Sequence, residues 1–222
     1  MTAQRLEILH RDDDIVVVLK PAGLLSVASP GASGTTVVEA LRRMGVAALP
    51  VHRLDRDVSG VMVLGRHEGA RATLESAFRA RSVEKVYWAL AQGRVKPASG
   101  TFDWPIEDRG ADAAVSPRGK PAVTKFRTLS HAGPCTEVEI DLLTGRYNQI
   151  RLHFAHARFP LVGERKYAFG RDAVVKFKRV ALHAMTLALP HPKTGARLSW
   201  TAPLPADLSE LVTRLRSGPS SP

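Results

Sequence analysis

Short apolar runs separated by turn residues open the chain, and they predict strands that alternate with helices. Residues 15–19 are all apolar and lead into the turn sequence of residues 20–23, a pattern typical of a short buried strand. A helix is predicted over residues 37–44, because apolar side chains recur there at helical spacing after a threonine cap, Thr35 or Thr36.

The rest of the chain continues in the same way and predicts an α+β protein. Its patterns predict, in order, a strand ending at residue 66, a helix over 68–81, strands over 83–90 and 101–106, a loop over 107–120, a hairpin around 130–133, a basic helix over 148–157, a hairpin over 182–201 and a helix over 206–216. Strands outnumber helices and short turns join them, which favours a mixed, mostly antiparallel sheet with flanking helices. We find no internal repeat and no long linker, so we expect a single domain over residues 1–216 and a disordered tail over 217–222.

The charge of the chain points to a polyanionic partner. Among 222 residues, 32 are Lys or Arg and 21 are Asp or Glu, which leaves a net charge of +11. This excess is spread along the chain, so it indicates a basic working face rather than a basic tail. We therefore expect nucleic acid as the partner, ahead of an anionic membrane surface.

The remaining composition indicates a cytoplasmic protein. Cys135 is the only cysteine, which excludes an intrachain disulfide, and its strand-like surroundings predict an inert buried thiol. The first residues do not read as a signal peptide, and no apolar stretch approaches the length that spans a membrane. We expect no membrane association.

One segment stands out as a candidate for chemistry. Residues 52–60 read His-Arg-Leu-Asp-Arg-Asp-Val-Ser-Gly, so Asp55 lies between Arg53 and Arg56 in a polar turn that precedes apolar residues 61–64. A carboxylate that is held ionised where a loop meets a sheet is suited to act as a nucleophile. The alternative is structural, because an aspartate in a polar turn often accepts hydrogen bonds from neighbouring amides.

A second polar segment, residues 145–153, opens the predicted basic helix. Asn148 and Arg151 are three positions apart and therefore share one helical face. An arginine beside Asp55 would keep its carboxylate ionised. Spacing does not establish this pairing, and Arg151 could equally be a solvated surface residue.

Together these segments resemble a known family. The stretch 52–60 is similar to the His-Arg-Leu-Asp-x-x-Thr-Ser-Gly signature of the RluA-type pseudouridine synthases. Further blocks similar to that family follow the family order: Lys20-Pro21-Ala22-Gly23-Leu24 before this stretch, and after it Lys85-Val86-Tyr87-Trp88-Ala89, residues 145–153, residues 159–163, Leu182-His183-Ala184 and His191-Pro192. The resemblance covers about residues 8 to 205.

The resemblance implies the synthase catalytic fold and the isomerisation of uridine to pseudouridine in a structured RNA, ribosomal or transfer RNA, with neither cofactor nor metal. It implies that Asp55 is the nucleophile, with the ribose C1′ or the uracil ring as its target. Tyr87 would stack on the base and help to remove a proton, and Arg151 would hold and orient Asp55. Arg53 would fill the space that the flipped nucleotide leaves.

The resemblance also implies a set of substrate-binding residues and a monomeric enzyme. Besides Arg53, the substrate-binding residues are His52, Asn148, Gln149, Ile150, Leu182 and His183. Many relatives carry a small RNA-binding domain in front, but here the first motif begins at Lys20. We therefore expect RNA to be selected by the basic surface of the catalytic domain itself.

The chain departs from the family pattern at a few positions. Val58 stands where Thr is usual, Tyr147-Asn148 replaces Thr-His, and Glu164 replaces the common Asp. These departures bear on substrate preference more than on the chemistry, because Asp55, Tyr87 and Arg151 are all present.

Two other functions compete with this interpretation. His153 and His156 could suggest a metal site, but a His-x-x-His pair without acidic or cysteine ligands is a weak signal; a helix face or RNA contacts explain these histidines better. A metal-dependent nuclease would need a carboxylate cluster, and the only acidic run, residues 12–14, is explained by turn chemistry. A non-catalytic RNA-binding protein that kept the synthase fold is the stronger rival.

Overall fold

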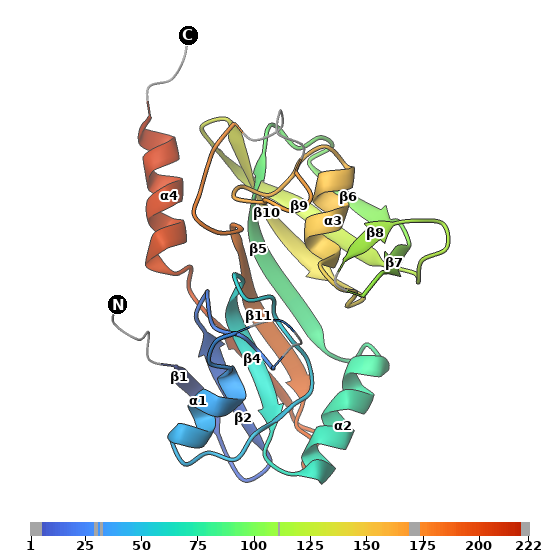
Figure 1. Ribbon diagram of the computed structural model, residues 1–222, viewed down its shortest axis with the longest axis vertical. Coiled ribbons are helices and arrows are strands. Elements are labelled where there is room, and N and C mark those ends of the chain that lie inside the picture. The colour runs from blue at the N-terminus through green and yellow to red at the C-terminus, as the bar shows by residue number, and fades with distance from the viewer. Residues whose placement is uncertain (1–5, 29–30, 32, 111, 169–173, 219–222) are drawn as a thin grey trace. The chain divides into compact units, whose positions relative to one another are not determined.

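The computed structural model describes residues 6–28, 31, 33–110, 112–168 and 174–218, and it divides the chain into two compact units (Figure 1). Unit 1 consists of Met1–Lys85 and Ala184–Pro203, and unit 2 of Val86–His183 and Leu204–Pro222. Each unit is therefore built from two separate segments of the chain. The expected α+β class, with a mostly antiparallel sheet and helices, is confirmed.

Unit 1 is a sheet with two helices. Its strands follow the order β1-β2-β4-β11, with β12 paired to β11 and β3 to β4. Its elements are β1 (Glu7–Arg11), β2 (Ile15–Lys20), α1 (Val37–Arg43), β3 (Leu49–Pro50), β4 (Ser59–Gly65), α2 (Glu68–Arg79), β11 (Leu182–Pro190) and β12 (Arg197–Thr201).

The apolar runs that predicted strands supply the core of unit 1. Alternate residues of β2 and β4 (Ile15, Val17, Val61 and Val63) are buried against Leu74 of α2 and against Leu187 and Leu189 of β11. The helix predicted after Thr35 or Thr36 begins at Thr36, whose side chain accepts from the Glu39 amide while the Glu39 side chain accepts from the Thr36 amide. This reciprocal capping satisfies amides that a helix start leaves without partners.

Unit 2 contains a second set of antiparallel strands in the order β5-β10-β9-β6, and a small β7-β8 hairpin. Helix α3 packs against β8 and β9, and α4 packs against β9. The elements of unit 2 are β5 (Glu84–Gln92), β6 (Ser99–Asp103), β7 (Ile106–Asp108), β8 (Ala113–Val115), β9 (Val123–Ala132), β10 (Cys135–Leu142), α3 (Gln149–His156) and α4 (Ala206–Ser217).

Three predictions about strands need correction. The segment predicted as a loop over 107–120 contains β7 and β8, whose three-residue strands are too short to show a period. The strand predicted over 101–106 is interrupted at Pro105, which lacks the amide hydrogen needed in a ladder. Strand β1 was not predicted, because its sequence Glu-Ile-Leu-His-Arg does not alternate.

Two smaller expectations can be compared with the structure. Cys135 is fully buried, as predicted, and burial raises the pKa of its thiol to about 11. The tail predicted over 217–222 falls largely outside the described residues, and Ser217 itself ends α4. In the part of the chain that is described, no helix is both long and apolar enough to cross a membrane.

Candidate active site

A buried lysine anchors the loop that carries Asp55. Lys20, the last residue of β2, is fully buried, and its ammonium donates to the carbonyl oxygens of Pro21 (3.1 Å), Leu24 (2.6 Å) and Arg56 (3.0 Å). Buried charges require partners of this kind. Because Arg56 follows Asp55 directly, Lys20 ties the Asp55 loop to the turn that follows β2.

Leu54, the residue before Asp55, is held by hydrogen bonds to its backbone. The buried hydroxyl of Ser26 donates to the Leu54 carbonyl oxygen (2.7 Å) and accepts from the Leu54 amide (3.0 Å). The Gly23 amide donates to the Arg56 carbonyl oxygen at 2.8 Å. Asp55, itself partly exposed, is thus held between two fixed neighbours.

The turn at Asp55 closes without the threonine hydroxyl of the family pattern. The Val58 amide donates to the Asp55 carbonyl oxygen at 3.1 Å, and the Val58 side chain is buried. A main-chain hydrogen bond therefore closes the turn, while the apolar side chain at this position fills the core instead of making a polar contact.

The two arginines beside Asp55 have different surroundings. Both side chains are exposed, but Arg56 Nε donates to the Gly23 carbonyl oxygen at 3.2 Å. Arg56 therefore helps to hold the loop. Arg53 lies on the surface, as a residue that contacts RNA would.

His52 links the loop to the sheet and to α2. Its Nε2 accepts from the Val63 amide at 3.1 Å, and its ring stacks on Phe78 with 4.8 Å between ring centroids. Burial, with the charge of Lys85, lowers the pKa of His52 to about 3, so the imidazole is neutral. This histidine supports the loop through an uncharged ring.

Tyr87 is a buried residue of β5 in unit 2. It lies opposite Ile140 in the antiparallel pairing of β5 with β10 and is 8% exposed. Strand pairing on β5 fixes its backbone, which is a suitable support for a ring that must keep a constant position.

Arg151 is clamped on one side by a buried carboxylate. Its Nε and Nη2 donate to Glu164 Oε2 (2.6 Å) and Oε1 (2.9 Å), and its Nη1 donates to Asn148 Oδ1 (3.0 Å). The Glu164 side chain is fully buried. Such a bidentate pair sets the plane of the guanidinium as well as its position.

Glu164 is kept ionised by its contacts. Burial acts to raise its pKa, but the hydrogen bonds and charge of Arg151, with the amides of Lys166 and Tyr167, outweigh burial and lower the pKa. The Tyr167 ring lies 5.3 Å from the guanidinium carbon of Arg151. Arg151 is therefore held by a carboxylate, an amide and a ring.

Asn148 completes this support through an unusual backbone conformation. It has φ = 53°, in the left-handed region that asparagine tolerates better than most residues. In this position its Nδ2 donates to the Tyr167 hydroxyl at 2.7 Å while its Oδ1 accepts from Arg151. The departure at Asn148 thus suits both the backbone and the support of Arg151.

Gln149 is buried and its amide is used within the protein. Its Nε2 donates to the Val123 carbonyl oxygen (3.1 Å) and to Thr124 Oγ1 (2.9 Å). Its Oε1 accepts from Thr144 Oγ1 (2.8 Å) and from the Arg146 amide (3.0 Å). These four bonds match the donors and acceptors of a side-chain amide, so Gln149 fixes the start of α3.

The other three predicted substrate-binding residues are buried. Ile150 lies on α3, and Leu182 and His183 begin β11. Their burial is compatible with lining an apolar wall.

The structure thus brings Arg53 and His52 into one fixed loop with Asp55, and Asn148 into contact with Arg151. Sequence reasoning did not identify Lys20, Ser26 and Tyr167 as supports of these groups. It noted Glu164 only as a departure from the family pattern. No local signal identifies these supports, because their partners lie 13 to 36 positions away.

His153 has no ring nitrogen available for a metal. It is fully buried, with Nδ1 bonded to Thr124 Oγ1 and Nε2 to the Trp104 carbonyl oxygen, each at 2.9 Å. His153 lies on the buried face of α3, so the alternative that it contacts RNA is wrong, whereas His156 is exposed.

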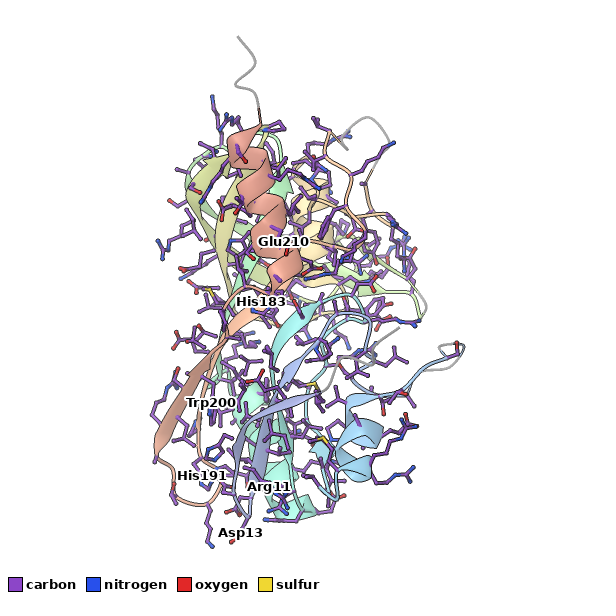
Figure 2. All side chains as sticks on the ribbon, turned by 90° about the vertical axis from the view of Figure 1, so that its left-hand side faces the viewer. Arg11, Asp13, His183, His191, Trp200 and Glu210 are labelled. Atoms are coloured by element: carbon purple, nitrogen blue, oxygen red, sulfur yellow. The ribbon has the colours of Figure 1, made fainter. Side chains whose placement is uncertain are left out.

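The acidic run of residues 12–14 forms hydrogen bonds within a turn, as expected. Asp12 Oδ1 accepts from the amides of Asp14 and Ile15, each at 2.8 Å, and Oδ2 contacts His10 (2.7 Å) and His191 (3.2 Å). Figure 2 shows Asp13, Arg11 and His191 at this same end.

Asp12, Asp14 and His191 each offer a possible metal-ligand atom within 4.8 Å of the others. However, His191 Nδ1 accepts from the amides of Lys193 and Thr194, so its proton is on Nε2, which donates to Asp12. Hydrogen bonds account for this cluster.

Comparison with known proteins gives consistent matches. A family model described as RNA pseudouridylate synthase matches residues 14–156. The chain is 37% identical to ribosomal large subunit pseudouridine synthase D of Escherichia coli (strain K12) over 96% of this chain and 71% of that protein. It is 38% identical to the protein of the same name from Pseudomonas aeruginosa, over 95% of this chain and 72% of that protein.

Solved structures give the same result. The human protein RNA pseudouridylate synthase domain containing 4 superimposes with a TM-score of 0.81 at 26% identity, covering 95% of this chain and 93% of that one. The human domain containing 1 protein follows with a TM-score of 0.76 at 25% identity, covering 96% of each chain.

Proposed function

Because the chain belongs to the RluA-type family of RNA pseudouridine synthases, which are isomerases, we propose that it converts specific uridines of ribosomal RNA to pseudouridine. The observation that carries this proposal is the 37% identity, over 96% of the chain, to a synthase named for the large ribosomal subunit. Transfer RNA is the other substrate that the sequence allowed. Mapping the pseudouridines in ribosomal and transfer RNA from cells with and without the gene distinguishes the two substrates.

In the proposed reaction Asp55 is the nucleophile. The bond between uracil N1 and ribose C1′ breaks, the uracil turns, and a bond between C5 and C1′ forms. The proton on C5 leaves and N1 regains one, so the product is an isomer and no cofactor is needed. Attack by Asp55 on C1′ and attack on the ring both satisfy this balance. The loop contacts of Lys20 and Ser26 support the role, because covalent catalysis needs a positioned carboxylate.

Tyr87 and Arg151 act with Asp55 in this proposal. Tyr87 stacks on the uracil and helps to remove the C5 proton, and Arg151 orients the carboxylate of Asp55. The contacts of Arg151 with Glu164 and Asn148 support this role, since a guanidinium fixed in its plane loses less freedom when it binds another carboxylate.

The remaining predicted residues bind or support the substrate. Arg53 takes the space of the flipped nucleotide, and Ile150, Leu182 and His183 form apolar surroundings for the base. His52, Asn148 and Gln149 act indirectly, because His52 Nε2 and the side-chain amides of Asn148 and Gln149 form hydrogen bonds within the protein. We propose that the chain works as one catalytic domain and as a cytoplasmic monomer.

Replacing the nucleophile tests the chemistry. Asp55→Ala should abolish pseudouridine formation in ribosomal RNA, a loss of at least about 10⁴-fold, because the variant lacks the carboxylate that forms the proposed covalent intermediate. Product is measured by chemical mapping of pseudouridine in RNA from cells with and without the gene and in purified reactions.

RNA affinity is the matched control for this variant. It should stay within about threefold of the unchanged protein, because phosphate contacts supply most of the affinity. Activity that survives in Asp55→Ala would disprove the nucleophile. RNA binding without turnover by the unchanged protein would favour a non-catalytic RNA-binding protein.

A further inference from the structure

Two basic side chains of unit 1 lie where α2 leads into β5 (Figure 1), and both lack an anionic partner among the described residues. Arg81 is exposed, and Lys85 is half-buried on β5. Neither side chain forms a hydrogen bond or an ion pair with a described residue, although the charge of Arg81 acts on Lys85. Two positive charges that repel each other are thus left without a counterion, which favours an anion from outside the protein.

This pair lies beside the loop that carries Asp55. Phe78, near the end of α2, stacks on His52 of that loop and packs against the core cluster that contains Val83. The charge of Lys85 in turn contributes to the low pKa of His52. Lys85 therefore lies on the side of unit 1 where the Asp55 loop is held.

The carboxylate next to Lys85 in the sequence is turned away from it. Glu84 Oε2 accepts from Arg197 Nη2 at 3.0 Å. Consecutive residues of a strand point to opposite faces, so Glu84 and Lys85, both in β5, do not pair. On its own side Lys85 meets the positive charge of Arg81 and the neutral ring of His52.

The Lys85 ammonium is open to a ligand. Within the described residues, the enclosed side-chain nitrogen and oxygen atoms that lack a hydrogen-bond partner are Arg66 Nε and Thr128 Oγ1. The Lys85 ammonium also lacks a partner but is not one of these enclosed atoms, so it keeps contact with solvent. A cationic donor that is half-buried and still accessible is suited to bind a phosphate oxygen.

Arg81 occupies a backbone position that glycine prefers. It follows Ala80, the C-cap of α2, and has φ = 58°, in the left-handed region. An arginine in this conformation costs stability relative to glycine. No hydrogen bond or ion pair of its side chain with a described residue offsets that cost, whereas a contact with a bound anion would give the side chain a use.

We propose that Lys85 and Arg81 bind a backbone phosphate of the RNA near the uridine that Asp55 attacks. The anion chemistry stands on the two basic residues, and its assignment to RNA rests on the proposed function. Lysine binds phosphate as a point charge and arginine through a fork of donors, so the pair suits a phosphodiester. Such contacts position the RNA and take no part in the bond changes.

Removing the Lys85 charge tests the substrate contact. Lys85→Met should raise the KM for ribosomal RNA about tenfold and leave kcat within about threefold, because one phosphate contact is lost. Lys193→Met is the control, since it removes the same charge from an exposed lysine of unit 1, and its KM should change less than about twofold. Equal KM changes in the two variants would overturn the proposal.

Urea unfolding separates a substrate contact from a structural one. Burial and the charge of Arg81 lower the pKa of Lys85 from 10.5 to about 8, so its positive charge opposes folding below about pH 8, and the effect fades as the pH rises towards 10.5. At pH 7, Lys85→Met and Arg81→Gly should each raise the unfolding midpoint, the second by removing backbone strain, while each weakens RNA binding at least about threefold. A lower midpoint in either variant would show that the residue supports the fold and would overturn its role in binding.

The pH dependence of RNA binding gives a third test, which needs no turnover. Between pH 7.5 and 9 the affinity of the unchanged protein should fall at least about threefold more than that of Lys85→Met in filter binding. Lys85 loses its proton in this range, while Arg81 keeps its charge and His52 stays neutral. Identical pH profiles would overturn the Lys85 contact. If the pH effect is found but the unchanged protein forms no pseudouridine, the proposed function fails and the anion site stands.

Discussion

Burial determines how much an ion pair contributes to the stability of this protein, as a comparison of two arginine–glutamate pairs illustrates. Arg151 Nε lies 2.6 Å from Glu164 Oε2, and Arg127 Nε lies 2.6 Å from Glu139 Oε1. The Arg151 side chain is 16% exposed and that of Arg127 is 62% exposed. Equal distances therefore do not imply equal energies, because water screens the exposed pair.

The Glu164→Gln variant tests the clamp on Arg151. It keeps the shape and removes the charge, so we expect kcat to fall about 10- to 100-fold with little change in KM, because Arg151 loses its fixed orientation. The free energy of unfolding should fall by about 2 kcal/mol, since a buried guanidinium loses its counterion. Single-turnover kinetics and urea unfolding measure the two effects.

Glu139→Gln is the matched control for this variant. It removes the same charge from the exposed pair, and the expected loss is below about 1 kcal/mol with unchanged kcat. Equal losses of kcat and of unfolding free energy in the two variants would show that Glu164 does not hold Arg151 in a functional orientation.

The pH dependence provides a further check on Glu164. Its pKa is lowered on folding from an ordinary value of 4.5, so its stabilisation is complete above about pH 4.5 and is lost as the pH falls through the lower folded value. The stability difference between the unchanged protein and Glu164→Gln should therefore shrink below about pH 4.5.

Lys20 is the second residue whose burial gives a prediction. Lys20→Met fills a similar volume but removes the ammonium that donates to the Pro21 and Leu24 carbonyl oxygens, while the Arg56 carbonyl oxygen keeps its bond from the Gly23 amide. We expect a loss of about 3 kcal/mol in unfolding free energy, since buried acceptors then lack partners.

Lys193→Met is the control for Lys20→Met, because Lys193 is exposed. It should change the unfolding free energy by less than about 0.5 kcal/mol. Both values come from chemical unfolding, and a stable Lys20→Met protein would contradict the anchoring role.

At the scale of elements, predictions succeeded where local signals were complete. Helix α1 has a threonine cap, an acidic first turn and basic residues in its last turn, and each is readable in sequence. Strands β2 and β4 are continuous apolar runs. The β7-β8 hairpin carries no such signal, since its pairing depends on contacts with α3 and on Lys120 bonding Ile106.

The approach of β4 to β11 depends on one glycine. Gly60 has φ = 133°, and a Cβ there would lie 2.2 Å from the Ala184 carbonyl oxygen. Gly60→Ala should therefore destabilise the protein by more than about 3 kcal/mol, because the clash is with backbone on a neighbouring strand. Thermal unfolding followed by circular dichroism measures this.

Gly195→Ala separates the clash from backbone strain. Gly195 also has positive φ, at 72°, but a Cβ there has nothing within 4 Å. Gly195→Ala should lower the free energy of unfolding by about 1 kcal/mol, which is the strain of a non-glycine residue in the left-handed conformation without a clash. Similar costs at the two positions would argue against the close approach of β4 and β11.

At the scale of the whole molecule, we expect the net charge of +11 to govern the proposed association with RNA. Neutralising phosphates releases counterions, so RNA affinity should fall at least about 100-fold between 50 and 200 mM salt. Filter binding at several salt concentrations measures the slope, with a neutral polymer as control. A flat response would exclude a basic RNA-binding face.

Each of the two units combines an early segment of the chain with a later one. Unit 1 is completed by Ala184–Pro203 and unit 2 by Leu204–Pro222. Apolar periodicity identified these closing segments as a hairpin and a helix, but it carries no information about which strands they join. Partners distant in sequence are chosen by packing of the whole chain.

The sequence alone was sufficient to identify the helices, most strands, the buried thiol and the motif blocks that indicated the family. Each of these features depends on residues that are neighbours in the chain. The folded chain was needed to show that Lys20 supports the Asp55 loop and that Glu164 holds Arg151. It was also needed to show that His153 is buried. Buried charges and hydroxyls take their partners from whatever the fold places beside them, and no spacing in the sequence encodes that choice.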